Sequence, residues 1–131
     1  MNILVVDDDF LNRRLLQKQL SIVGECDVAV DGAEAIQAFQ LGWDNNEPYD
    51  LICMDITMPN INGKEALKRI RQIENERGIR EQDRVKVLMT TAHDDAASVV
   101  ESYQEGAAGY LVKPIGRKKL LDELNRLDLI N

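Results

Sequence analysis

The sequence has 131 residues, of which 44% are hydrophobic and 30% are charged, and its formal net charge is −7. This length suits one globular domain with a single core and leaves no room for two. The acidic balance argues against a nucleic-acid-binding surface, and no apolar run approaches the roughly 20 residues of a membrane span. Because the amino terminus also lacks the features of a secretory signal, we expect a cytoplasmic protein without direct membrane or nucleic-acid contacts.

Short apolar runs alternate with helical patterns along the chain. The runs predict five strands, buried on both faces, over residues 3–6, 28–30, 51–54, 85–89 and 110–112. Apolar residues at helical spacing predict five helices over residues 10–22, 32–41, 63–77, 95–105 and 116–128, and in the first of them these residues are Leu11, Leu15, Leu16 and Leu20. Five strand–helix units indicate a parallel sheet with helices on both sides. We therefore predict one α/β domain over residues 1–131, a flavodoxin-like doubly wound fold with five parallel strands in the order 2-1-3-4-5 and five helices.

Two cysteines and one tryptophan are expected to have structural rather than functional roles. Cys26 and Cys53 lie in apolar runs without metal-binding spacing, which predicts buried free thiols. Trp43 falls in the polar stretch after the second predicted helix, so we expect it to lie in a loop and to serve packing.

Carboxylates follow two strands that are neighbours in the predicted sheet. Asp7, Asp8 and Asp9 follow the first strand, and Asp55 follows the third. Ligands bind at this edge of such folds. Two carboxylates about 4 Å apart repel by about 4 kcal/mol at the effective dielectric of a protein surface, so a positive charge should compensate. Lys113 after the fifth strand could supply it, and so could Mg²⁺, which prefers oxygen ligands; these two are not exclusive.

Four stretches of the sequence carry a family resemblance. They are "VVDDD", "MDITMPNINGKEALKRIR", "VLMTTA" and "GAAGYLVKPI". In this order and with these separations, they resemble the signature blocks of the response-regulator receiver domain, in particular its CheY-like single-domain members. The resemblance extends from Asn2 to about Leu127 and implies a signalling domain of two-component systems rather than an enzyme acting on external substrates.

The resemblance implies a role for each residue of the acidic site. Asp55 would be the phosphoacceptor, taking a phosphoryl group from a phosphohistidine on a sensor histidine kinase or a histidine phosphotransfer protein, or from a small acyl phosphate. Asp8 and Asp55 would bind Mg²⁺ through their carboxylates, the backbone carbonyl of Thr57 would be a third ligand, and Asp7 would contribute through water. Mn²⁺ would be able to substitute for Mg²⁺.

The resemblance also implies a conformational switch. Lys113 would pair with Asp55 and then with the phosphoryl group, and the Thr91 hydroxyl would bind another phosphoryl oxygen while the Tyr110 ring turns inward. Thr57 and His93 would tune dephosphorylation, although a lone loop histidine often has no function. The readout would be the surface of the fourth helix, fifth strand and fifth helix, roughly residues 94–127, which would control a partner protein.

Other functions are weighed against this one. A phosphatase of the haloacid-dehalogenase type would need an aspartate two residues after the nucleophile, where the chain has Thr57. A phosphorylation-independent pseudo-receiver would be expected to lack one of the acidic, threonine or lysine positions, and all are present. A diffusible effector, a phosphorelay intermediate and a fragment of a longer protein remain open. We expect a monomer, with a dimer through the switching surface as the alternative.

Overall fold

The computed structural model of the protein describes residues 1–92 and 96–130. In this part of the chain, five strands alternate with five α-helices. The strands are β1 (Asn2–Val6), β2 (Glu25–Ala29), β3 (Leu51–Asp55), β4 (Lys86–Thr91) and β5 (Gly109–Val112). The helices are α1 (Phe10–Leu20), α2 (Gly32–Asp44), α3 (Gly63–Glu76), α4 (Ala96–Gln104) and α5 (Arg117–Arg126), and a short 3₁₀ helix, η1 (Glu81–Asp83), precedes β4.

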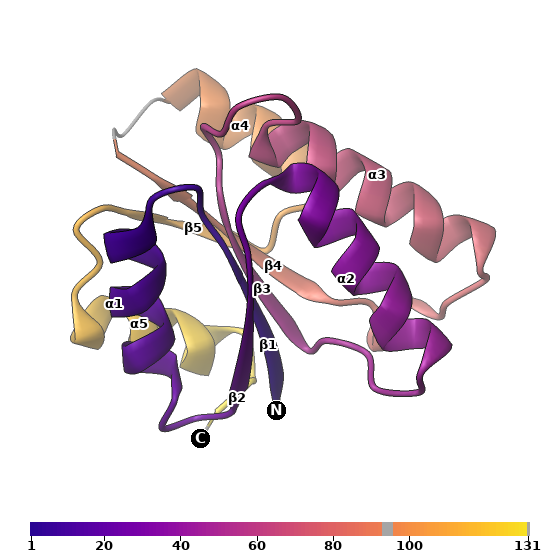
Figure 1. Ribbon diagram of the computed structural model, residues 1–131, viewed down its shortest axis with the longest axis horizontal. Coiled ribbons are helices and arrows are strands. Elements are labelled where there is room, and N and C mark those ends of the chain that lie inside the picture. The colour runs from indigo at the N-terminus through magenta and orange to yellow at the C-terminus, as the bar shows by residue number, and fades with distance from the viewer. Residues whose placement is uncertain (93–95, 131) are drawn as a thin grey trace.

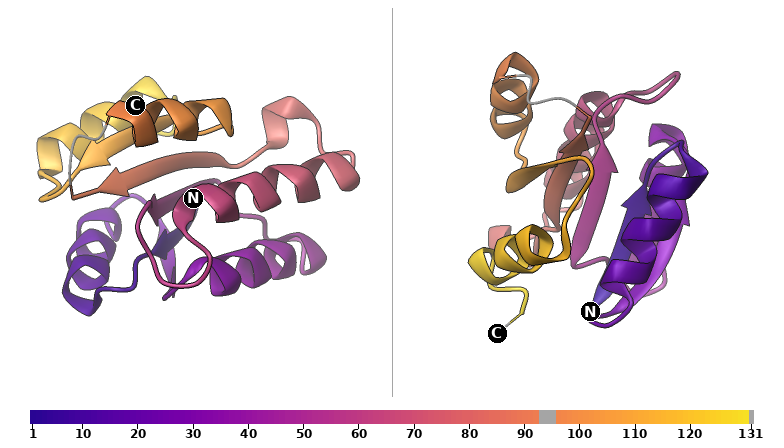
Figure 2. Two further views of the ribbon diagram at one scale, coloured as in Figure 1. Left: turned by 90° about the horizontal axis from the view of Figure 1, so that it is seen from above. Right: turned by 90° about the vertical axis from the view of Figure 1, so that its left-hand side faces the viewer.

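All five strands are parallel and lie in the order β2-β1-β3-β4-β5 (Figure 1). Helices α1 and α5 cover one face of the sheet, and α2 and α3 lie on the other (Figures 1 and 2). The predicted flavodoxin-like α/β fold is thereby confirmed. The order places β1 beside β3, so their carboxyl ends meet at the same edge.

The central strands are buried on both faces because each face is covered by helices. On the α1 and α5 side, Ile3, Val5 and Cys53 of the strands pack with Leu20 and Leu120 of the helices. The opposite core is built from the alternate strand residues together with apolar side chains of α2 and α3, namely Leu4, Val6, Ile52, Met54, Phe39, Leu67 and Ile70. This period-two division follows from the pleat of the strands.

A buried ion pair ties α3 to its neighbours. The side chain of Glu74 has no exposed surface, and its two carboxylate oxygens accept from Arg71 Nη1 at 2.7 Å and from the backbone N–H of Val85 at 2.9 Å. The Arg71 guanidinium also donates to the carbonyl of Val85 at 2.9 Å and to the carbonyl of Gly106 at 2.8 Å. Two side chains of α3 thus bind the backbone before β4 and the backbone after α4.

The edge strand β2 differs from its prediction. It covers Glu25–Ala29 rather than residues 28–30, and it is not buried on both faces, since Val28 is 45% exposed. The expectation of burial on both faces fails here because β2 has a paired strand on one side only and pairs with β1 alone.

Several helical residues also lie elsewhere than expected. Leu11 and Leu15 of α1 were expected on the buried stripe with Leu16 and Leu20, but they are 74% and 50% exposed. Trp43 belongs to α2, which continues to Asp44, and not to a loop, although it does pack against the core. None of the helices in the described ranges is both long and apolar enough to cross a membrane.

The two cysteines are free, as predicted, but only one is buried. Cys53 in the central strand β3 is fully buried, and Cys26 in the edge strand β2 is half-buried. Burial raises the pKa of the Cys53 thiol to about 12 and also raises the pKa of Cys26. Both thiols are therefore protonated near neutral pH, which makes them poor nucleophiles.

Candidate functional site: an acidic cluster at the sheet edge

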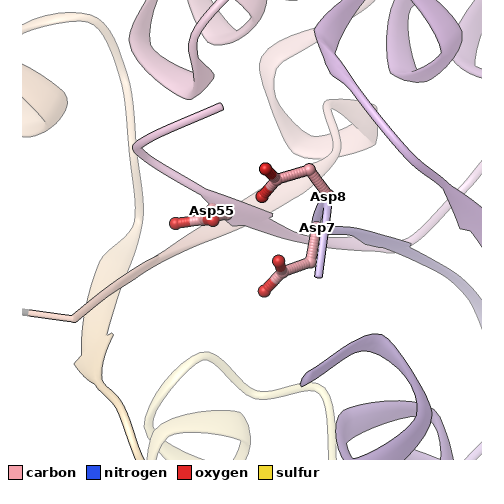
Figure 3. A group of neighbouring side chains, drawn as sticks. All are labelled: Asp7, Asp8 and Asp55. Atoms are coloured by element: carbon pink, nitrogen blue, oxygen red, sulfur yellow. The ribbon is translucent and has the colours of Figure 1, made fainter. Parts of the chain in front are cut away.

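Three carboxylates meet where β1 and β3 end. One oxygen from each of Asp7, Asp8 and Asp55 lies within 4.8 Å of the others, and Figure 3 shows the three side chains gathered at this edge of the sheet. Asp7 and Asp55 are buried and Asp8 is exposed. Three carboxylates with one open side form a hard oxygen donor set, which fits Mg²⁺ with retained waters.

Lys113 brings a positive charge into the acidic cluster. Its ammonium Nζ lies 2.7 Å from Asp7 Oδ2 and 3.3 Å from Asp55 Oδ2, so the shorter contact is to Asp7 rather than to the predicted partner Asp55. The backbone N–H of Lys113 donates to the carbonyl of Thr91 at 2.7 Å, which places the lysine beside the end of β4. Although burial lowers it, the pKa of Lys113 is raised overall by the hydrogen bond to Asp7 and the charge of Asp55, so the ammonium stays charged.

The third aspartate of the "DDD" run has a different role from the other two. Asp9 is the N-cap of α1, and its Oδ1 accepts from the backbone N–H groups of Leu11 at 2.9 Å and Asn12 at 3.3 Å. Asp7 Oδ1 in turn accepts from the backbone N–H of Asp9 at 2.9 Å. A capping aspartate satisfies N–H groups that the first turn of a helix leaves unpaired, so Asp9 fixes the start of α1 beside the site.

Asp55 is the carboxylate with the most perturbed acidity. Burial raises the pKa of Asp55 from 3.8 to about 6, with the negative charge of Asp7 adding to the rise. The Lys113 ammonium and the backbone N–H of Thr57, which donates to Asp55 Oδ1 at 3.3 Å, act in the opposite direction and do not cancel it. A bound cation would lower the pKa of Asp55 again, because its positive charge favours the ionised carboxylate.

The remaining predicted residues are only partly brought to this cluster. Thr91 is the buried last residue of β4 and pairs in register with Val112 of β5, and Tyr110 lies on β5 opposite Met89. Thr57 is exposed and lies two residues after Asp55, in the loop that follows β3. His93 lies outside the described residues.

Gly63 is a site-supporting residue that the sequence analysis did not single out. It begins α3, its backbone N–H donates to the carbonyl of Ile56 at 2.9 Å, and a Cβ there would overlap the carbonyl oxygen of Asp55. Only a residue without a side chain lets α3 approach Asp55 this closely. The sequence signal was the glycine in "NINGKEAL", directly after the N-cap Asn62.

Comparison with known proteins places the chain in one family. Residues 3–125 match the family model of the response regulator receiver domain. The chain is 31% identical to the chemotaxis protein CheY of Bacillus subtilis, over 95% of its own length and 94% of that protein. It is also similar to CheY in the CheX-CheY-BeF3-Mg complex of Borrelia burgdorferi, with a TM-score of 0.82 and 26% identity over 98% of this chain and 89% of that one.

A third relative is the receiver domain of the response regulator Ssk1 from Saccharomyces cerevisiae, solved with the histidine phosphotransfer protein Ypd1. The TM-score is 0.84 and the identity 27%, over 95% of this chain and 86% of that one. Other relatives are longer: the chain spans 48% of the transcriptional regulatory protein DegU of Brevibacillus brevis and 12% of the sensor histidine kinase GacS of Pseudomonas protegens.

The fold and the acidic edge define a doubly wound α/β domain with a cluster of three carboxylates at the carboxyl ends of its strands. With a family match over almost its whole length, the chain belongs to the response regulator receiver domain family of two-component systems. The predicted resemblance is confirmed.

Proposed function

We propose that Asp55 accepts a phosphoryl group and that its phosphorylation switches the domain for a partner protein. The observation that carries the proposal is the meeting of Asp7, Asp8 and Asp55 within 4.8 Å, with the Lys113 ammonium in contact with two of them. An Asp55 oxygen attacks phosphorus, the bond from phosphorus to the donor breaks, and an aspartyl phosphate forms. We further propose that residues 1–131 act as one such domain.

The residues around Asp55 suit this reaction. Phosphoryl transfer concentrates negative charge on the phosphoryl oxygens, which positive charges and hydrogen-bond donors must stabilise. Lys113 supplies an ammonium, and Thr91 at the end of β4 supplies a hydroxyl. Asp8 and Asp55, with the Thr57 carbonyl and with Asp7 through water, would hold Mg²⁺, which would supply further positive charge.

The direct experiment is intact-mass spectrometry after incubation with acetyl phosphate. We expect a single phosphoryl adduct in the presence of Mg²⁺ and none after EDTA treatment, and Mn²⁺ is expected to replace Mg²⁺. An adduct that forms equally well in EDTA would contradict the metal-dependent site. The protein should not turn over the substrates of haloacid-dehalogenase phosphatases. Those enzymes need an aspartate two residues after the nucleophile, and here that position is Thr57.

We propose a protein phosphodonor and a protein target as partners. The similarity to a receiver domain solved with a histidine phosphotransfer protein supports a phosphohistidine donor, on such a protein or on a sensor histidine kinase. The surface of α4, β5 and α5 is the proposed readout. A partner retained only by the phosphorylated form would support an effector, and a partner that removes the phosphoryl group would support a relay.

Magnesium affinity is expected to depend on pH through Asp55. Because the pKa of Asp55 in the metal-free fold is raised to about 6, the proton competes with Mg²⁺ below that pH. The apparent affinity should fall by up to about tenfold for each pH unit below about 6 and level off above 7. Isothermal titration calorimetry at pH 5, 6, 7 and 8 would measure this, and an affinity independent of pH from 5 to 7 would refute it.

The same shift predicts the pH dependence of stability without metal. The folded pKa of Asp55 lies above its ordinary value of 3.8, so the fold binds this proton more tightly than the unfolded chain does. The contribution of Asp55 to stability is therefore largest below 3.8, declines as the pH rises to about 6, and stays lost above it. In urea unfolding at pH 7 without metal, Asp55→Asn should be more stable than the wild type by about 1 kcal/mol.

Lys113→Ala should separate phosphorylation from switching. The variant keeps all three carboxylates, so we expect a phosphoryl adduct with Mg²⁺, formed more slowly. It lacks the ammonium that would bind the phosphoryl oxygen, so the amide NMR signals of α4, β5 and α5 should not change on phosphorylation as those of the wild type do. If the amide signals of this variant changed on phosphorylation as those of the wild type do, Lys113 would not be needed for the switch.

A further inference from the structure

Tyr103 of α4 lies against Tyr110 of β5. The ring centroids are 6.3 Å apart and the rings are almost perpendicular, at 89°. This edge-to-face geometry is favourable because the positive ring edge meets the negative ring face. Tyr103 is 46% exposed and Tyr110 is half-buried, so the contact lies at the surface of the α4 and β5 region.

The backbone that carries Tyr103 is held from two sides. From α3, Arg71 Nη2 donates to the carbonyl of Gly106 at 2.8 Å, and from α5, Arg126 Nη2 donates to the carbonyl of Ala108 at 2.8 Å. Ser102, next to Tyr103, is 1% exposed, and its hydroxyl donates to the carbonyl of Ser98 at 2.8 Å. The end of α4 is therefore anchored, and the Tyr103 ring projects from a fixed support.

We infer that Tyr103 is a positioning residue that holds Tyr110 in the place described here and so opposes the switch. The inference rests on the proposed function and on the movement of the Tyr110 ring that the family resemblance implies when Asp55 is phosphorylated. In the arrangement described, the Lys113 ammonium contacts Asp7 and Asp55, as it would before a phosphoryl group arrives. A Tyr110 ring that leaves this place loses its contact with Tyr103.

Loss of the Tyr103 ring should therefore favour the switched state. An edge-to-face pair changes an equilibrium constant by a factor of about two to ten. Ligand binding and the switch are reciprocally linked, so a phosphoryl mimic should bind more tightly by up to that same factor.

The test uses ¹⁹F NMR of the full chain labelled with 3-fluorotyrosine, titrated with beryllium fluoride at saturating Mg²⁺. The chain has three tyrosines, and a Tyr110→Phe variant assigns the Tyr110 signal. In Tyr103→Ala we expect a shifted Tyr110 signal in the free protein and a beryllium fluoride affinity about two- to tenfold higher than in the wild type. Tyr103→Phe keeps the ring and should restore both. Val100→Ala, which removes another exposed apolar side chain of α4, is the matched control and should change neither.

The outcomes separate this inference from the proposed function. A wild type that does not bind beryllium fluoride would overturn Asp55 as the phosphoacceptor, whereas the Tyr110 signal of the free protein would still test the contact. An unchanged Tyr110 signal in Tyr103→Ala, or an affinity that is unchanged or lower, would overturn the positioning role.

Discussion

Asp55→Asn is expected to abolish the phosphoryl adduct completely. The amide keeps the size of the side chain but is not a nucleophile toward phosphorus, and the acidic cluster offers no equivalent replacement. Asp7 is engaged by Lys113 at 2.7 Å and by the N–H of Asp9 at 2.9 Å, and Asp8 is exposed. Intact-mass spectrometry with acetyl phosphate and Mg²⁺ should show the adduct in the wild type and only unmodified protein in the variant.

The control is Asp122→Asn, the same exchange at an exposed residue of α5 that pairs only with the exposed Lys118 among the interactions described. It should leave the adduct unchanged. Asp8→Asn should weaken Mg²⁺ binding and slow phosphorylation while leaving the phosphoacceptor in place. If Asp55→Asn still gave the adduct at wild-type yield, and peptide mapping located it on Asp7 or Asp8, the assignment of Asp55 as the phosphoacceptor would be wrong.

Arg71→Met is expected to cost about 3 kcal/mol of stability or more, since removing one partner of a buried ion pair leaves the other charge unpaired. The remaining Glu74 carboxylate would be fully buried and would keep only the N–H of Val85 as a donor among the described contacts. Gly106 would also lose its donor from α3. Urea unfolding followed by circular dichroism would measure the loss.

The double variant Arg71→Met/Glu74→Met removes both charges, so it should lose clearly less stability than the sum of the two single variants. The exposed pair Arg69 and Glu76 on the same helix is the matched comparison. Arg69→Met should change the free energy of unfolding by no more than about 1 kcal/mol, because exposed ion pairs contribute little. Additive losses for Arg71 and Glu74 would show that the buried pair has no special coupling.

The central part of the fold could be predicted because the apolar runs of β1, β3 and β4 are buried on both faces. The same strands end in the residues of the site, so their order alone brought Asp55 beside Asp7 and Asp8. The bounds of the edge strand β2 were predicted poorly, since exposed charged residues such as Glu25 and Asp27 carry no apolar signal.

Contacts that depend on the packing of side chains in the folded protein could not be predicted from the sequence. Glu74 sits in a charged helix and looks like a surface residue, but the fold buries it against Arg71 and Val85. The preference of Lys113 for Asp7 depends on side-chain geometry that strand order does not determine. The separate role of Asp9 depends on where α1 begins, and its hydrogen bonds from the N–H groups of Leu11 and Asn12 identify it as the cap of that helix.

The open side of β2 has a consequence for the behaviour of the protein at high concentration. An edge strand presents unpaired backbone groups to which a strand of another molecule could add, and charged side chains discourage such addition. Glu25 and Asp27 place two negative charges on this short strand, and Asp27 also accepts a hydrogen bond from the Tyr49 hydroxyl at 2.6 Å. Two copies that approached through β2 would bring like charges together, so this edge is protected against intermolecular sheet growth and amyloid-like stacking.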